Sequence, residues 1–359
     1  MKLLIAGGGT GGHVFPALRV AQEWLDRGDG HEAREVVLVG TKQGLEAKLV
    51  PEAGLPLETI RAAGLKGIGG ARLVYNAAML LPGLWDSAAL LRRHRFAAAL
   101  GVGGYASGPV MLLAAMNSIP SVIFEPNIEP GFTNRVLADM ATRVATGYEA
   151  TAERWGAKAV VTGCPIRQEF FDVPARKHNP PFRLLITGGS RGALPINRAV
   201  VDSLDLLATR KNQLFVVHQT GERDYNAVRV AYARREFPAE VVPFIQNMAE
   251  RFAQADLIVC RSGAITVAEI AAAGRAAIFI PFGAATDSHQ LRNAEGMQAK
   301  GAGRLIPQNE LAPERLANEI FSLLDQPQRM SEMERNARAL ARPRAVQEIV
   351  DLLERVARR

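Results

Sequence analysis

Short apolar segments that run into glycine-rich loops and then into helix-like segments recur along this chain. In the first, Leu3–Ala6 precedes Gly7–Gly12, and a segment with helical apolar spacing follows. In the second, Leu184–Ile186 precedes Gly188–Gly192 in the same way. Apolar runs that do not alternate with polar residues are typical of parallel strands covered by helices on both faces. The repetition therefore predicts two doubly wound α/β domains of similar architecture.

A turn-rich stretch between Gly163 and Pro181 separates the two sets of apolar runs. We expect an N-terminal domain over residues 1–163, a C-terminal domain over 164–342, and a closing helix over 343–359 that packs across the domain junction. The expected strands are 3–6, 36–39, 97–102, 121–124, 160–161, 184–186, 214–217, 241–242, 257–259 and 277–280.

The composition excludes several classes of protein. Cys164 and Cys260 form no pattern typical of a zinc site or a disulfide framework, which favours a reducing compartment. The apolar N-terminal stretch is too short for a signal peptide. Residues 96–124 carry no charge, but glycines and a proline interrupt them, so we expect strand, loop, helix and strand rather than a membrane span.

Positive charge is concentrated in residues 61–96, which hold six basic side chains against one acid, Asp86. Such a segment could bind nucleic acid, anionic lipid or a phosphorylated substrate, or it could be a solvated helix face. No aromatic and basic platform accompanies it, so we expect no nucleic-acid partner.

Within this basic region, Met79–Trp85 places a Pro-Gly turn signal inside an apolar run. An apolar turn is either buried or in contact with an apolar partner, and apolar plus basic residues bind anionic membrane surfaces. The expected membrane patch comprises Leu80, Leu81, Leu84, Trp85, Arg72, Arg92, Arg93 and Arg95; a buried helix pair is the alternative.

The run Gly7-x-Gly9-x-x-Gly12 matches the dinucleotide-binding fingerprint. That fingerprint also needs an acid at the end of the second strand, where this chain has Val39-Gly40-Thr41. A hydride-transfer enzyme is therefore disfavoured. The loop is expected to bring a phosphate or sugar to a helix N-terminus, unless its glycines serve only a tight turn.

Two loops of the second half have similar features. Ser190, flanked by glycines, can donate its hydroxyl to an anion at a helix start, or can be a simple N-cap. Residues 262–269 follow another strand, and Glu269 is placed to hold a ribose diol or is only a solvated helix residue. With the glycine loop 103–109 and the strand end at Glu125, these loops predict an active site between the domains.

Two motifs are absent from the sequence. No Asp-x-Asp pair is present to hold a diphosphate-bound Mg²⁺, so we expect no metal site and no required cofactor. Helix N-termini and arginines then have to stabilise a leaving diphosphate. No GxxxxGK[ST] is present either, which disfavours a P-loop NTPase.

Four of these segments together resemble the MurG family of bacterial N-acetylglucosaminyltransferases: residues 8–17, 103–109, 188–193 and 264–269, in the family's order and spacing. The resemblance implies the GT-B fold, with two Rossmann-like domains facing a deep cleft. It implies inverting transfer of GlcNAc from UDP-GlcNAc to the C4 hydroxyl of MurNAc in undecaprenyl-pyrophosphoryl-MurNAc-pentapeptide (lipid I), which forms lipid II. Peptidoglycan synthesis, and through it cell shape, cell division and the cell cycle, would be its setting.

The resemblance also implies the location and the partners. The protein would be peripheral, at the cytoplasmic face of the bacterial inner membrane, on an anionic surface. Cell-wall synthesis or division proteins would be further partners. Another GT-B enzyme acting on a different lipid or natural product, a UDP-GlcNAc 2-epimerase and a non-catalytic UDP-sugar-binding subunit are the alternatives.

Individual roles follow from the same resemblance. Ile245 would contact uracil through its backbone, Glu269 would hold the ribose, and Ser190 the diphosphate. The implied donor site comprises Thr10, Gly11, Gly12, Asn127, Arg167, Ser190, Ile245, Ala264, Ile265, Thr266, Val267, Ala268, Glu269 and Gln290. The loops implied to face the acceptor's pyrophosphate contain Gly9, His13, Gly103, Gly104 and Tyr105.

Two positions depart from the family pattern. The family often has two adjacent glutamines where this chain has His289 and Gln290, which puts one sugar contact in doubt. Pro126 replaces a more usual polar residue. For the base that takes the acceptor's proton we expect His13, because histidine titrates near neutral pH, with Glu125 in reserve; His13 could instead only orient the acceptor's pyrophosphate.

Overall fold

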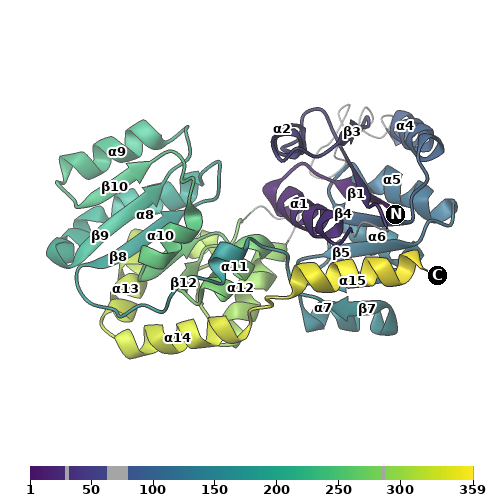
Figure 1. The fold of residues 1–359 in the computed structure, drawn as a ribbon. Helices are drawn as coiled ribbons and strands as arrows, with labels where there is room; N and C mark the ends of the chain where they lie inside the picture. Colours follow the sequence, from purple (N-terminus) through teal and green to yellow (C-terminus); the bar gives the residue numbers. More distant parts are fainter. Residues whose placement is uncertain (29–31, 63–79, 284–287, 359) are drawn as a thin grey trace. The chain divides into compact units, whose positions relative to one another are not determined.

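The computed structural model describes residues 1–28, 32–62, 80–283 and 288–358, and the chain forms two compact units (Figure 1). The first unit contains Met1–Ile166 and Arg342–Arg359, and the second contains Arg167–Ala341. These limits fall close to the expected domain boundaries, except that the C-terminal segment belongs to the first unit.

The first unit is a seven-stranded sheet with the strand order β3-β2-β1-β4-β5-β6-β7, and its neighbouring strands pair in parallel. Its strands are β1 Lys2–Gly7, β2 Glu35–Gly40, β3 Leu57–Thr59, β4 Ala98–Gly103, β5 Ser121–Glu125, β6 Arg143–Thr146 and β7 Ala159–Val161. Its helices are α1 Gly11–Asp26, α2 Glu46–Glu52, α4 Leu80–Arg93, α5 Ser107–Met116, α6 Phe132–Met140, α7 Glu149–Glu153, the 3-10 helix η1 Gly156–Lys158 and α15 Ala345–Ala357.

The second unit is a six-stranded parallel sheet with the order β10-β9-β8-β11-β12-β13. Its strands are β8 Phe182–Thr187, β9 Leu214–Gln219, β10 Ala239–Val242, β11 Leu257–Cys260, β12 Ala276–Phe279 and β13 Arg304–Leu305. Its helices are α8 Leu194–Leu207, α9 Tyr225–Arg234, α10 Met248–Gln254, α11 Ala264–Ala273, α12 His289–Ala299, α13 Pro313–Leu324 and α14 Pro327–Ala339, with 3-10 helices η2 Gln168–Phe170, η3 Ala208–Gln213 and η4 Gln308–Glu310.

The central strand of the first unit is buried on both faces, as its unalternated sequence predicts. Leu4 and Ala6 of β1 belong to a core that also contains Leu90 of α4 and Val110 of α5. Ile5, on the opposite face, lines a small internal cavity with residues of α1. The doubly wound α/β architecture expected from the sequence is therefore confirmed, and every strand expected from an apolar run is present.

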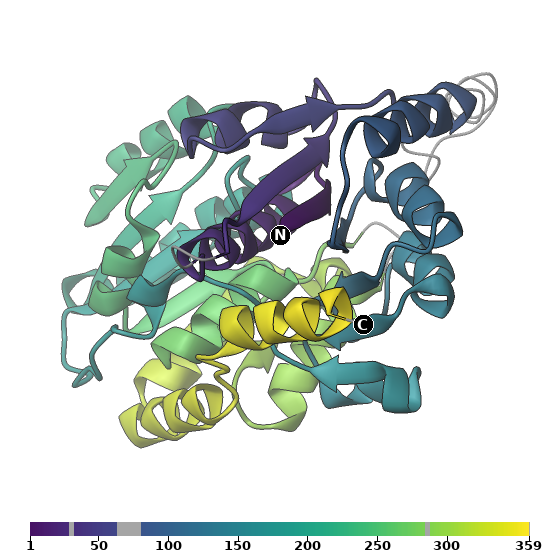
Figure 2. The same ribbon diagram turned by 45° about the vertical axis from the view of Figure 1, so that its right-hand side comes forward.

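The C-terminal helix α15 lies beside α1 in both views of the ribbon (Figures 1 and 2). Its apolar face is buried, with Ile349 and Leu353 fully enclosed. On its polar face, Asp351 accepts from Arg27, the C-cap of α1, at 2.6 Å. A helix thus forms in the segment expected to close the chain, and it packs on the first unit; its packing across the domain junction stays a prediction.

The strand order of each unit reverses once, between β1 and β4 in the first unit and between β8 and β11 in the second. Ligands of open α/β sheets bind outside the carboxyl ends of the strands at such switch points. All four glycine- or serine-containing loops expected from the sequence to bind ligand follow these four strands. In the described part of the chain, we find no helix that is both long and apolar enough to cross a bilayer.

Candidate active site

The glycine loop after β1 is held by a buried carboxylate that we did not predict. Glu46, the first residue of α2, is 2% exposed and accepts from the backbone N–H of Gly9 at 2.7 Å. The same carboxylate accepts from the N–H and the hydroxyl of Thr41 at 2.8 and 2.9 Å. Burial raises the pKa of Glu46, but these hydrogen bonds lower it further than burial raises it, so the net shift is downward.

His13 lies in the first turn of α1, directly after this loop. Its Nδ1 is 3.0 Å from the carbonyl oxygen of Gly8 and 3.3 Å from the hydroxyl of Thr10. Since a carbonyl can only accept, Nδ1 carries the hydrogen, and Nε2 is the acceptor nitrogen of the neutral ring. This tautomer suits a base that takes a proton at Nε2.

The loop after β4 approaches the loop after β1 so closely that its glycines are required for packing. A Cβ on Gly104, which has φ +85°, would lie 2.3 Å from the carbonyl oxygen of Gly8. A Cβ on Gly103 would lie 3.0 Å from Nε2 of His13. The structure therefore brings His13 and the β4 loop together, while the side chain of Tyr105 is exposed.

Glu125, the reserve candidate for the base, lies at the end of β5 and is 1% exposed. Its Oε1 accepts from the N–H and the side-chain amide of Asn127, both at 2.9 Å. Its Oε2 accepts from the N–H of Gly131, the N-cap of α6, and from the side chain of Asn134, again both at 2.9 Å. Four donors on one carboxylate favour an anchor that orients Asn127 over a base that must receive a proton.

In the second unit, Ser190 lies in an exposed turn closed by a hydrogen bond from Gly192 N–H to the carbonyl of Gly189 at 2.9 Å. The N-cap of α8 is Ala193, so Ser190 is not a helix cap. Gly192 is needed for close packing, since its φ is +71° and a Cβ would lie 1.8 Å from the carbonyl oxygen of Thr220. The space over Gly189 is open.

Gln219, which we did not predict, joins this turn to Ile245. Its amide nitrogen donates to the carbonyl of Gly189 at 2.9 Å, and its oxygen accepts from the N–H of Ile245 at 2.8 Å. The backbone expected to contact uracil is thus fixed from the end of β9. With that N–H already donated to Gln219, the carbonyl of Ile245 is the group left to accept from a base.

The N-terminus of α11 begins after Gly263, over which there is open space. Glu269 lies in the second turn of this helix, and its side chain is 16% exposed. Burial raises its pKa to about 7, while Arg167, whose Nη2 is 3.8 Å from the carboxylate, acts in the opposite direction. The alternative of a solvated helix residue therefore does not hold. Ala264, Ile265, Thr266, Val267 and Ala268 form the first turns of this helix.

Gln290 belongs to the same part of the second unit. Its side-chain oxygen accepts from the N–H of Phe282 at 2.9 Å, and its carbonyl accepts from the hydroxyl of Ser262 at 2.7 Å. The guanidinium of Arg261 donates to the carbonyls of Ile280 and Pro281, and burial lowers its pKa to about 10. The bonds to Phe282 and Ser262 hold Gln290, the second residue of α12, in the position from which it is expected to contact a sugar. His289 is the first residue of α12.

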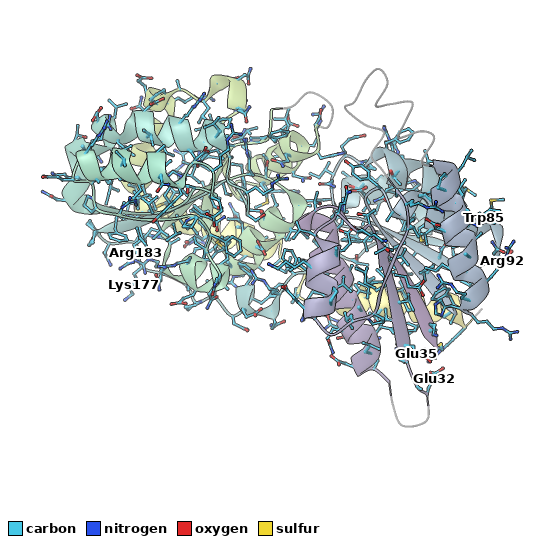
Figure 3. The ribbon with its side chains drawn as sticks, turned by 90° about the horizontal axis from the view of Figure 1, so that it is seen from above. Glu32, Glu35, Trp85, Arg92, Lys177 and Arg183 are labelled. Carbon is cyan, nitrogen blue, oxygen red and sulfur yellow. The ribbon has the colours of Figure 1, made fainter. Side chains whose placement is uncertain are left out.

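The expected Pro-Gly turn at Pro82 and Gly83 is wrong, because both residues lie in the first turns of α4. Proline is tolerated there, since the first N–H groups of a helix have no partner within it. Leu81 and Trp85 are 74% and 72% exposed. Trp85 and Arg92 both project outward from this helix (Figure 3). Leu84 is only half-buried, and Arg93 pairs with Glu58 at 2.7 Å.

The other three residues of the predicted membrane patch are Arg95, Arg72 and Leu80. Arg95 is exposed, Arg72 lies outside the described residues, and Leu80 is described only as the start of α4. Within the described ranges, no group of three or more His, Cys, Asp or Glu side chains is arranged to hold a metal ion.

Two family models cover most of the chain. The glycosyltransferase family 28 N-terminal domain matches residues 3–146, and the family 28 C-terminal domain matches residues 183–349. Among solved structures, a UDP-GlcNAc 2-epimerase from Neisseria meningitidis is 12% identical with a TM-score of 0.69, covering 99% of this chain and 100% of its own, which shows a shared fold alone.

Closer relatives define the family within this fold. MurG from Acinetobacter baumannii is 32% identical with a TM-score of 0.81, covering 99% of both chains. The UDP-N-acetylglucosamine–N-acetylmuramyl-(pentapeptide) pyrophosphoryl-undecaprenol N-acetylglucosamine transferase of Geotalea uraniireducens is 45% identical over 99% of this chain and 98% of its own. The chain therefore belongs to the MurG family of glycosyltransferases, with the GT-B fold.

Proposed function

We propose that this protein transfers GlcNAc from UDP-GlcNAc to the C4 hydroxyl of MurNAc in undecaprenyl-pyrophosphoryl-MurNAc-pentapeptide, with inversion, to form lipid II. The observation that carries the proposal is the 45% identity, over nearly the full length of both chains, to a relative whose name states this donor and this acceptor. The site geometry is compatible with it, since each unit has its ligand-facing loops at the switch point of its sheet.

The donor nucleotide belongs on the second unit. Glu269 accepts from the ribose hydroxyls, and the carbonyl of Ile245 accepts from N3–H of uracil. Ser190, Arg167 and the N-terminus of α11 hold the diphosphate, because hydroxyl, guanidinium and helix N–H groups all stabilise phosphate oxygens. Asn127 and Gln290, with the Thr10–Gly12 segment, contact the sugar. Support comes from the hydrogen bonds that already hold Ile245 and Gln290 in place.

Transfer needs a base for the acceptor hydroxyl and a stabilised leaving group. His13 takes the proton at Nε2, since its Nδ1 is hydrogen-bonded to Gly8. The proton leaves the C4 hydroxyl as its oxygen attacks the anomeric carbon, and the bond to UDP breaks. The positive ends of helix dipoles and Arg167 offset the charge on UDP, so no metal or cofactor is required.

The acceptor is a membrane lipid, so we also propose that the protein works peripherally at the cytoplasmic face of the inner membrane. Leu81 and Trp85 contact the bilayer, and the exposed Arg92 and Arg95 attract anionic headgroups. Flotation with vesicles containing phosphatidylglycerol tests this. Leu81→Asp/Trp85→Asp should lose recovery, whereas Val230→Asp, at an exposed position on α9, should not; equal recovery of all three proteins refutes the assignment.

Purified protein with labelled UDP-GlcNAc and a lipid I analogue tests the reaction itself. Label that moves to the lipid supports transfer. Free UDP with a new hexosamine supports epimerisation, and no turnover supports a binding subunit. His13→Ala should lower kcat by about 100-fold or more while donor affinity is kept, and near-full turnover at saturating substrates would eliminate His13 as the base.

A further inference from the structure

We propose that Glu46 is a positioning residue for His13, acting through the single peptide group that joins Gly8 to Gly9. The inference rests on the proposed function, in which His13 takes the acceptor's proton. It concerns a residue outside the substrate-facing loops, at the start of α2.

Both polar atoms of that peptide group are engaged. Its N–H, on Gly9, donates to Glu46 Oε2 at 2.7 Å. Its carbonyl oxygen, on Gly8, accepts from His13 Nδ1 at 3.0 Å. The carboxylate, the peptide and the imidazole therefore form one continuous hydrogen-bonded chain, in which a carboxylate orients a histidine with a peptide group between them.

Glu46 is fixed in this position from every side. Thr41 donates twice to its other oxygen, as described above. Three glycines leave room for the carboxylate: a Cβ on Gly8, Gly40 or Gly44 would lie 2.3, 2.3 or 2.1 Å from an atom of the Glu46 side chain. The downward shift of its pKa keeps the group ionised at neutral pH.

The arrangement has two consequences for His13. A negative charge on the N–H side of a peptide polarises its carbonyl and strengthens the hydrogen bond that the carbonyl accepts. The hydrogen therefore stays on Nδ1, and Nε2 is kept as the accepting nitrogen. The charge also stabilises the imidazolium that forms when Nε2 takes a proton.

Among the described residues, a second carboxylate, that of Glu125, is linked to the His13 ring through Asn134. Asn134 of α6 lies near Gly103, against which Nε2 of His13 also lies, and its amide donates to Glu125. The β1 and β4 loops contribute backbone groups and the hydroxyl of Thr10. Removing the charge of Glu46 therefore leaves Glu125 as the anion on the α6 side, behind a neutral amide.

Glu46→Gln, Glu46→Asp and the control Glu52→Gln separate an electrostatic role from a packing role. Gln keeps the volume and loses the charge, whereas Asp keeps the charge and loses volume. Glu52 lies on the same helix with its side chain 56% exposed. We expect Glu46→Gln to lower kcat by about 10- to 100-fold with little change in the donor KM, Glu46→Asp to lower it less, and Glu52→Gln to leave it unchanged.

Two further measurements test whether Glu46 acts through His13. In a double-mutant cycle, Glu46→Gln should cost little in a His13→Ala background. The acidic limb of the pH–kcat profile should move to lower pH in Glu46→Gln, because the protonated ring loses a stabilising charge. In ¹⁵N-histidine NMR of the unmutated protein, which does not depend on the folding of a variant, the neutral ring of His13 should carry its hydrogen on Nδ1.

Several results would overturn the inference: an Nε2–H tautomer, full additivity of the two losses, an unshifted profile, or Glu46→Asp being more damaging than Glu46→Gln. Failure of the proposed function is a separate outcome, since it shows as an unmutated protein that moves no label to lipid I. In that case the NMR tautomer still reports whether the hydrogen-bonded chain exists.

Discussion

Replacing Glu269 by glutamine should make the second unit more stable at neutral pH and less able to bind UDP. Burial raises the pKa of this carboxyl from 4.5 to about 7. Ionising it in the folded state therefore costs about 3 kcal/mol, at 1.36 kcal/mol for each unit between the two values. The side chain is only 16% exposed, so little solvent screens this cost.

The sign of the pH dependence follows from proton binding. Between pH 4.5 and about 7 the folded state keeps a proton that the unfolded state has lost, so stability falls as pH rises through this window. The free energy of unfolding of Glu269→Gln minus that of the parent should thus increase by about 3 kcal/mol from pH 4.5 to pH 7.5. Glu332→Gln, at an exposed position on α14, should show no such change.

The assay has to report on the second unit. Trp24, Trp85 and Trp155 all lie in the first unit, so tryptophan fluorescence follows the wrong part of the chain. Hydrogen exchange of peptides covering β11, after equilibration in urea at each pH and labelling at one fixed pH, follows the second unit. A difference between variant and parent that is flat with pH would refute the reasoning.

UDP binding supplies an independent check. Accepting from both ribose hydroxyls favours the ionised form of Glu269, so UDP binding at pH 6 should release a proton from this carboxyl. Calorimetry in buffers of different ionisation enthalpy measures this release, and Glu269→Gln serves as the reference that subtracts protons lost by the phosphates. Equal release by both proteins contradicts a ribose-binding role for this carboxyl.

Three further changes have defined outcomes. Gly192→Ala should destabilise the second unit by about 2 kcal/mol or more, and Gly189→Ala by less. Both glycines have positive φ, but only a Cβ on Gly192 would meet a backbone carbonyl. Equal losses of stability in urea titrations would contradict this reasoning. Burial lowers the pKa of His178, but Asp256 and Glu334 raise it further, from 6.5 to about 9 in all. His178→Gln should therefore lower the free energy of unfolding by about 3 kcal/mol below pH 6.5. In the same titrations, this loss should disappear as pH rises through 9. Glu125→Gln should raise the donor KM by misplacing Asn127 and keep kcat within about tenfold, whereas a 100-fold loss of kcat would identify a base.

The sequence predicts the fold well because parallel strands buried on both faces leave a plain signal. Every apolar run expected to form a strand does so. The strands that were not expected are β3, β6 and β13, which are short and contain charged or hydroxyl side chains. The turn predicted at Pro82 was wrong because the same residues are compatible with the first turns of a helix.

The loops of the site could be predicted, but the residues that hold them could not. Glu46, Gln219 and the donors around Glu125 act through hydrogen bonds to backbone groups distant in sequence. Such bonds follow no periodicity and no fixed spacing. No acid follows the second strand, and the carboxylate that reaches the loop, that of Glu46, comes from the next helix.

The return of α15 to the first unit bears on how the chain folds during synthesis. The second unit is one continuous segment, whereas the first unit is completed only when residues 342–359 have emerged from the ribosome. Until then, the surface of the first unit that α15 covers stays exposed. The second unit, although it is translated later, can complete its fold first. Salt bridges such as that between Arg34 and Glu354, which join the first-made part of the chain to the last, can form only after residues 342–359 have been synthesised.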